Sequence, residues 1–141
     1  IGTSNTSIIN SFSECGSAIG YLFQIRDDIL GVWGKSKHTG KPVGSDIKRK
    51  KNSFPICYAI SNSKNKTKKF LIDIYSKKII TDEDVNEILN VLDNLKVRKH
   101  AETIAAHHGQ KAINALNQKN IPHANKTQMN ELVDFLLSRN Y

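Results

Sequence analysis

The stretch FQIRDDILG, residues 23–31, places two adjacent carboxylates, Asp27 and Asp28, inside an otherwise apolar helical pattern. A second stretch, TGKPVGSD at residues 39–46, adds glycine breakers, a lysine and another aspartate, and the basic run KRKK follows at residues 48–51. Carboxylate oxygens bind Mg²⁺, and ammonium groups bind phosphate oxygens. The two stretches together therefore suit a diphosphate that is bound through a metal ion.

An all-α fold of about six helices is predicted, because apolar residues recur every three or four positions and no segment has the pattern of a strand. We expect one long helix over about 6–33 and a glycine-broken loop over 34–52. Ser53 is the expected N-cap of the next helix, with Pro55 in its first turn. The remaining helices are expected near residues 70–75, after a capping box of Thr81 and Asp84, over about 98–118, and at the end of the chain.

Length and composition indicate one domain that is not built to cross a membrane. The chain has 141 residues, of which 38% are hydrophobic, and no apolar run approaches the roughly 18 residues of a membrane span. Cys15 and Cys57 lie in apolar patterns and are expected to be buried free thiols, which suits a reducing, cytoplasmic location. The net charge of +8 favours anionic partners, namely nucleic acid, acidic lipid or phosphorylated substrates, and does not choose among them.

The carboxylate pair has two explanations at this stage. Residues four apart share a helix face, so Gln24 lies above Asp28 and Phe23 above Asp27. On a buried face the carboxylates need a counter-charge, which metal ions or an arginine would supply. On an exposed face they are solvated surface charges, and the pair alone does not decide between these cases.

The lysines that follow the pair favour the ligand-binding explanation. Lys41 and Lys51 are candidate diphosphate donors, because a lysine ammonium is a mobile point charge that can follow a flexible anion. Asp46 is expected to orient one of these lysines or to hold a metal-bound water. The alternative for the basic run at 48–51 is a solvated face.

Residues 20–34, GYLFQIRDDILGVWG, resemble the second aspartate-rich region of the trans-polyprenyl diphosphate synthases, which include the geranylgeranyl and farnesyl diphosphate synthases. Residues 39–47, with SFP at 53–55, resemble the loop and helix start that follow this region in the family. The ending FLLSRNY, residues 135–141, is similar to the family's C-terminal Arg-x-Tyr. The resemblance implies that residues 1–141 form the C-terminal half of the all-α isoprenoid synthase fold.

The chemistry implied by the resemblance is Mg²⁺-assisted prenyl transfer by a cytoplasmic, homodimeric enzyme. An allylic diphosphate ionises, isopentenyl diphosphate attacks the carbocation, and the product is five carbons longer, with the geranylgeranyl type favoured. Carried over by position, Asp27 would ligate Mg²⁺, with Asp28 supporting it. Lys41 and Lys51 would bind the allylic diphosphate, and Gln24 would offer its amide to the diphosphate or to the nascent cation.

Two departures from the family pattern bear on activity. The family's fullest motif has a third aspartate at the position of Gly31, so metal binding is expected to be weaker in principle. The family's first aspartate-rich motif lies on an earlier helix and is not found here, so we expect an N-terminal half or a second subunit to supply it. The chain alone is then expected to be inactive.

Two other functions were compared with the enzyme. A regulatory, non-catalytic partner of a prenyl diphosphate synthase stays open, although the intact Phe-Gln-x-x-Asp-Asp and Thr-Gly-Lys patterns favour the enzyme. A nucleic-acid binder is disfavoured, because no aromatic residues alternate with the lysines as stacking platforms would require.

Overall fold

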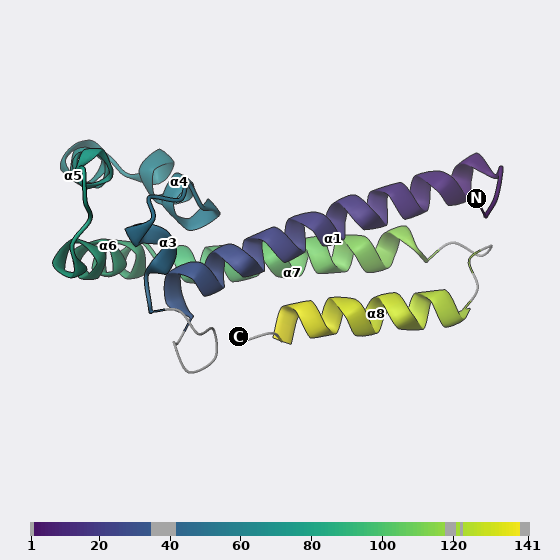
Figure 1. Cartoon of the computed structure of the whole chain (residues 1–141). Coiled ribbons are helices and arrows are strands. Elements are labelled where there is room, and N and C mark those ends of the chain that lie inside the picture. The colour runs from purple at the N-terminus through teal and green to yellow at the C-terminus, as the bar shows by residue number, and fades with distance from the viewer. Residues whose placement is uncertain (1, 35–41, 118–120, 122, 139–141) are drawn as a thin grey trace. The chain divides into compact units, whose positions relative to one another are not determined.

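The computed structural model describes residues 2–34, 42–117, 121 and 123–138, and it is helical without strands over these residues. Figure 1 shows the order of the helices along the chain. The helices are α1 (Thr6–Trp33), α3 (Ser45–Lys48), α4 (Phe54–Asn62), α5 (Asn65–Ser76), α6 (Asp82–Asn94), α7 (Val97–Ala115) and α8 (His123–Ser138). The all-α prediction is confirmed, and the six longer helices correspond to the six expected.

Two details differ from the sequence-based expectation. The one-turn helix α3 lies within residues 34–52, which were expected to form a loop, because a single turn is too short to show an apolar repeat. Helix α5 begins at Asn65 rather than near residue 70, because its first turn is lysine-rich and carries no apolar signal. Neither difference changes the fold class.

The contacts divide the chain into two compact units. Among the described residues, the first unit contains those up to Arg26 and those from Thr103 to Ser138, and the second contains Asp27–Glu102. Helices α1 and α7 therefore contribute residues to both units. Each unit has its own buried residues, and every candidate site contact described below lies within the second unit.

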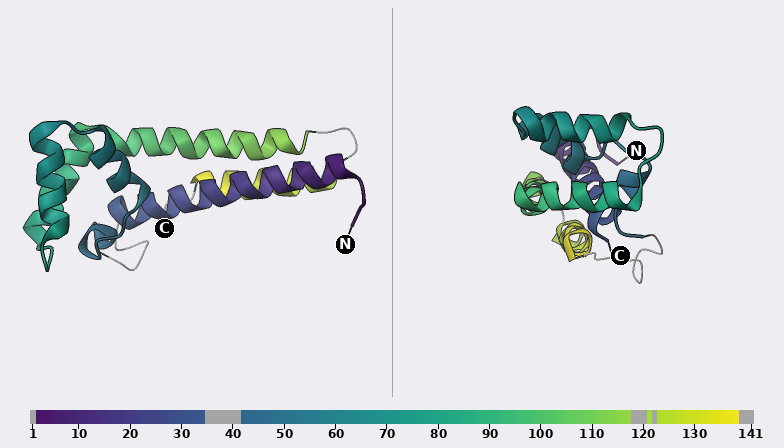
Figure 2. Two further views of the ribbon diagram at one scale, coloured as in Figure 1. Left: turned by 90° about the horizontal axis from the view of Figure 1, so that it is seen from above. Right: turned by 90° about the vertical axis from the view of Figure 1, so that its left-hand side faces the viewer.

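The first unit is built from α8 and from the parts of α1 and α7 that belong to it (Figures 1 and 2). Its buried apolar residues are Cys15, Ala18, Leu22, Ile25, Ala105, Ala112, Leu116, Ile121, Val133 and Leu136. A Cβ at Gly109 would lie 3.0 Å from Val133 Cγ1, so the glycine permits the close approach of α8 to α7. Burial raises the pKa of the Cys15 thiol.

The second unit has a continuous apolar core. Its buried members are Val32, Ile47, Ile56, Ala59, Leu71, Ile74, Ile80, Val85, Ile88, Leu92 and Val97, which come from the end of α1, from α3 to α6 and from the start of α7. Cys57 is exposed, contrary to the prediction of a buried thiol, because α4 turns it away from this core; both cysteines are free. No helix in the described part of the chain is long and apolar enough to span a bilayer.

The two predicted helix starts have different outcomes. The capping box of α6 is confirmed, because Thr81 Oγ1 accepts a hydrogen bond from Asp84 N (3.2 Å) and Asp84 Oδ2 accepts one from Thr81 N (3.0 Å). Ser53 does occupy the N-cap position of α4, but its side chain makes no capping hydrogen bond there. The carboxylate of Asp28 accepts a bond from Phe54 N instead (2.6 Å).

Candidate functional site

The carboxylate pair lies near the C-terminal end of α1, and its two members have different surroundings. The Asp27 side chain is 51% exposed, whereas the Asp28 side chain is 6% exposed. Successive residues are about 100° apart around a helix, so one of the pair faces the core of the second unit and the other faces out. The two aspartates are therefore not equivalent, although they are neighbours in sequence.

Lys51 joins both aspartates to a third carboxylate. Its ammonium nitrogen (Nζ) lies 2.9 Å from Asp28 Oδ1, 3.2 Å from Asp27 Oδ2 and 3.2 Å from Asp46 Oδ2. We call Asp27, Asp28 and Asp46 the carboxylate cluster. One ammonium group against three carboxylates leaves the cluster and lysine with a formal charge of −2, which is a favourable setting for a divalent cation.

The backbone after α3 places Lys51 at the cluster. Lys50 adopts a left-handed conformation (φ 55°), which ends the helical turn and reverses the chain direction. The backbone N–H of Lys51 then donates to Asp46 O (2.9 Å), which holds its Cα next to α3. These local features return the Lys51 side chain to the carboxylates of α1.

Asp28 also connects two helices of the second unit. Its Oδ1 atom is paired with Lys51, while its Oδ2 atom accepts the hydrogen bond from Phe54 N, the first residue of α4. A carboxylate at a helix N-terminus also interacts favourably with the helix dipole. The side chain is thereby fixed at both oxygens.

Asp46 occupies space that Gly31 leaves free. A Cβ at residue 31 would lie 2.1 Å from Asp46 Oδ2 and 2.3 Å from its Cγ, closer than atoms can approach. The glycine that replaces the family's third aspartate therefore admits a different carboxylate, that of Asp46, which is buried. Asp46 Oδ2 contacts Lys51 as an ion pair at 3.2 Å but accepts no hydrogen bond among the described residues.

Electrostatics hold the lysine in its charged form. Burial by itself lowers the pKa of the Lys51 ammonium, but its interactions with the carboxylates of Asp28, Asp27 and Asp46 outweigh burial, and the net effect is a raised pKa. Lys51 is therefore protonated at neutral pH and acts as the counter-charge that the cluster needs.

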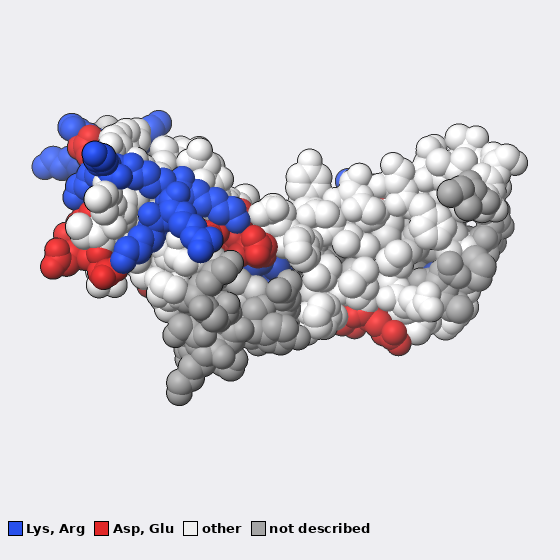
Figure 3. Space-filling model, viewed as in Figure 1, with Lys and Arg blue, Asp and Glu red and all other residues white. Residues whose placement is uncertain are grey.

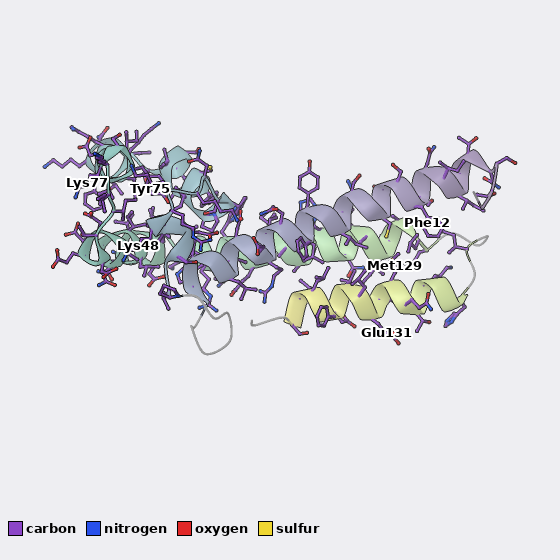
Figure 4. The ribbon with its side chains drawn as sticks, in the orientation of Figure 1. Phe12, Lys48, Tyr75, Lys77, Met129 and Glu131 are labelled. Atoms are coloured by element: carbon purple, nitrogen blue, oxygen red, sulfur yellow. The ribbon has the colours of Figure 1, made fainter. Side chains whose placement is uncertain are left out.

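Two other lysines of the basic run also make contacts. Lys48 forms an ion pair with Asp82, and the Lys50 ammonium donates to the backbone oxygen of Lys77. Figure 4 labels Lys48 and Lys77. Lys48 and Lys50, two of the four residues of the run, are thus tied to α6 and to the end of α5, and a purely solvated face does not describe the run. On the face shown in Figure 3, Lys and Arg side chains gather over the second unit, beside acidic ones.

The structure brings together some of the predicted site residues and does not describe others. Asp27, Asp28 and Lys51 share one cluster. Lys41 and the Arg-x-Tyr ending lie outside the described residues. Gln24 belongs to the first unit, where it is exposed.

Sequence reasoning expected Asp46 to orient one of the lysines, and Asp46 does form an ion pair with Lys51. It did not foresee that Lys51 also pairs with Asp27 and Asp28, nor that Asp28 caps α4. The residues involved are 23 or more positions apart in sequence, so no local spacing signals them. The one available signal was Gly31, which was interpreted as a missing ligand rather than as room for Asp46.

Comparison with known proteins agrees with this fold. The sequence profile of the polyprenyl synthetase family matches residues 1–92, and the chain therefore belongs to that family. It is 32% identical over 131 residues to the geranylgeranyl diphosphate synthase of Saccharolobus solfataricus (90% of this chain, 37% of that protein). It is 25% identical over 136 residues to the (2E,6E)-farnesyl diphosphate synthase of Mycobacterium bovis (94% of this chain, 38% of that protein).

A solved structure shows the same arrangement of helices. The geranylgeranyl pyrophosphate synthase of Corynebacterium glutamicum, complexed with isoprenyl diphosphate and magnesium, matches with a TM-score of 0.83 and 25% identity. The match covers 98% of this chain and 39% of that one. The chain thus spans about two fifths of the length of the proteins that it matches.

Proposed function

We propose that this chain provides the diphosphate-binding and Mg²⁺-binding part of a trans-polyprenyl diphosphate synthase. The observation that carries the proposal is the convergence of Asp27, Asp28 and Asp46 on one cation, Lys51 Nζ, within 3.2 Å. Carboxylate oxygens are the ligands that Mg²⁺ prefers, so the donor set fits this ion. Family membership supports the same chemistry, and a relative's structure contains magnesium with isoprenyl diphosphate.

The reaction in question joins two diphosphates. The C–O bond of the allylic diphosphate breaks, and diphosphate leaves with the electron pair. The double bond of isopentenyl diphosphate then forms the new C–C bond, and a proton is lost to restore a double bond. A bound Mg²⁺ supplies positive charge to the leaving diphosphate.

The residues of the cluster have distinct proposed roles. Asp27 is the more exposed carboxylate and would face the metal and its ligand. Asp28 and Asp46 would contribute their oxygens from the buried side of the cluster. Lys51 and Lys41 would bind the diphosphate, with Lys41 assigned from the sequence alone. Gln24 would orient the diphosphate or face the nascent cation.

Features of the complete enzyme are further proposals. Relatives carry both farnesyl and geranylgeranyl names, and we favour the geranylgeranyl type of product. A cytoplasmic homodimer, with the first aspartate-rich motif supplied by an N-terminal half or a second subunit, completes the proposed enzyme. The alternative is a regulatory partner of a prenyl diphosphate synthase, in which the same cluster would bind ligand without turnover.

Calorimetric titration with geranyl diphosphate, with and without Mg²⁺, tests the site. We expect Asp27→Ala and Lys41→Ala each to lower the Mg²⁺-dependent affinity on the order of tenfold or more. Asp93→Ala and Lys64→Ala are matched controls, because these exposed residues belong to the same unit and are not members of the carboxylate cluster, and they should change little. Unchanged binding in both site variants would rule out the assignment.

A further inference from the structure

The carboxylate cluster holds a cation that belongs to the protein. Lys51 Nζ lies between 2.9 and 3.2 Å from one oxygen of each of the three carboxylates, at the point where those oxygens converge. A metal ion bound by the same oxygens would take this position, and two cations that share one set of ligands repel each other. The ammonium group and a divalent ion therefore compete for the cluster.

The lysine is the partner that can move. Asp28 is fixed at both oxygens, by Lys51 and by Phe54 N, and Asp46 is buried. The Lys51 side chain is 38% exposed and has a flexible four-carbon stem, while its backbone is held by the bond to Asp46 O. Its ammonium group can leave the cluster while its Cα stays in place.

We propose that Lys51 stabilises the carboxylate cluster in the metal-free chain and that an incoming divalent cation displaces its ammonium group, which is then free to bind the diphosphate. This inference rests on the proposed function, because it concerns the same site. The cluster with Lys51 has a formal charge of −2, and the cluster with Mg²⁺ in its place has a charge of −1. The exchange therefore lowers the net negative charge at the cluster and also releases an ammonium group for the anionic ligand.

The exchange makes the binding of metal and diphosphate mutually favourable. Without metal, Lys51 is engaged by the carboxylates and contributes little to diphosphate binding. With metal, it becomes a diphosphate ligand, so each ligand raises the affinity for the other by the same factor. A lysine that served only as a diphosphate donor would have no effect on metal affinity in the absence of diphosphate.

Removal of the ammonium group should therefore have opposite effects on the two ligands. Mn²⁺ binding to the purified chain, followed by electron paramagnetic resonance without diphosphate, is expected to tighten several-fold in Lys51→Ala. Inorganic pyrophosphate binding in saturating Mg²⁺ is expected to weaken several-fold in the same variant. Lys48→Ala is the matched control, because Lys48 belongs to the same basic run but pairs with Asp82, and it should alter neither affinity.

Lys51→Met keeps the aliphatic stem and repeats the test if the alanine variant fails to fold, as judged by circular dichroism. A readout on the unmodified protein is the rate at which an amine-acylating reagent labels Lys51, mapped by mass spectrometry. The rate should rise several-fold when Mg²⁺ is added, while that of Lys64 should not change.

The outcomes separate this inference from the proposed function. If Asp27→Ala weakens Mn²⁺ binding but removal of the Lys51 ammonium does not strengthen it, the exchange is wrong and the site assignment stands. If Mn²⁺ binds neither the original chain nor a Lys51 variant, both are wrong. If it binds only after the ammonium is removed, the exchange is supported in its strongest form.

Discussion

At the scale of single residues, adjacent carboxylates have different roles because helix geometry exposes one and buries the other. Asp28 is enclosed and bonded to Lys51 and to Phe54 N, whereas Asp27 is half-exposed and shares only the lysine. A buried hydrogen-bonding group that loses its partner costs more than an exposed one, which water can satisfy. Asp28 should therefore contribute to stability and Asp27 to ligand binding.

Substitution of the pair by alanine tests this division. Asp28→Ala should lower the free energy of unfolding by about 1–3 kcal/mol, because Phe54 N and Lys51 lose a buried acceptor. Asp27→Ala should change it by no more than about 0.5 kcal/mol. Urea unfolding followed by circular dichroism provides both values, and an equal loss in the two variants would show that the residues are equivalent.

Gly31 and Gly20 offer a second comparison on the same helix. An added Cβ at Gly20 meets no atom within 4 Å, so Gly20→Ala should stabilise the chain by about 0.5–1 kcal/mol through helix propensity. An added Cβ at Gly31 would displace the Asp46 carboxylate from its contact with Lys51. Gly31→Ala should therefore lower the free energy of unfolding, and a gain equal to that of Gly20→Ala would contradict the packing described here.

At the scale of elements, sequence patterns predicted the features that depend on residues close together in the chain. The capping box of α6 depends on two residues three positions apart, and the long helices depend on apolar repeats, so both were predictable. The cap of α4 was not, because its acceptor, Asp28, lies 26 residues away. The identities of Asp27, Asp28 and Lys51 as candidates were also predictable, but their mutual pairing depends on the left-handed turn at Lys50.

The start of α6 should make the free energy of unfolding sensitive to acid. The hydrogen bond from Lys77, followed by that from the Thr81 backbone, holds the pKa of Asp84 below its usual 3.8, against the opposing effect of burial. Since Asp84 binds its proton more readily when unfolded, its contribution to stability is complete above about pH 4 and is lost as the pH falls through the lowered pKa. The difference in unfolding free energy between the original chain and Asp84→Asn should therefore be constant near neutral pH and shrink below pH ~4.

Thr81→Ala serves as the control for that measurement. It removes the other half of the capping box without removing a titrating group, and it should cost about 1 kcal/mol over the same pH range. Urea unfolding at a series of pH values measures both variants. A difference for Asp84→Asn that stays constant down to pH ~2 would show that folding does not lower the pKa of this carboxylate.

At the scale of the whole molecule, the carboxylates of the described chain are unevenly available to a metal. The acidic group Asp82–Glu83–Asp84 is engaged, because Asp82 pairs with Lys48 while Asp84 pairs with Lys77 and caps α6. Among the residues that the structure describes, no group of three His, Cys, Asp or Glu side chains is arranged to hold a metal ion, and the three carboxylates of the cluster converge on Lys51 instead. Of the two aspartate-rich regions that the family resemblance implies, the described chain carries the second, at Asp27 and Asp28.

Because the chain carries one of the two aspartate-rich regions, we predict that it binds diphosphate but does not form product. The 141-residue chain should bind pyrophosphate in a Mg²⁺-dependent manner, because the cluster and its lysine lie within one compact unit. It should not incorporate labelled isopentenyl diphosphate into product with geranyl diphosphate, because a leaving diphosphate held from one side lacks the charge stabilisation that ionisation requires. Addition of a segment that carries the first aspartate-rich motif should restore product formation, and Asp27→Ala should abolish it again. Turnover by the chain alone that Asp27→Ala removes would show instead that this single cluster suffices for ionisation.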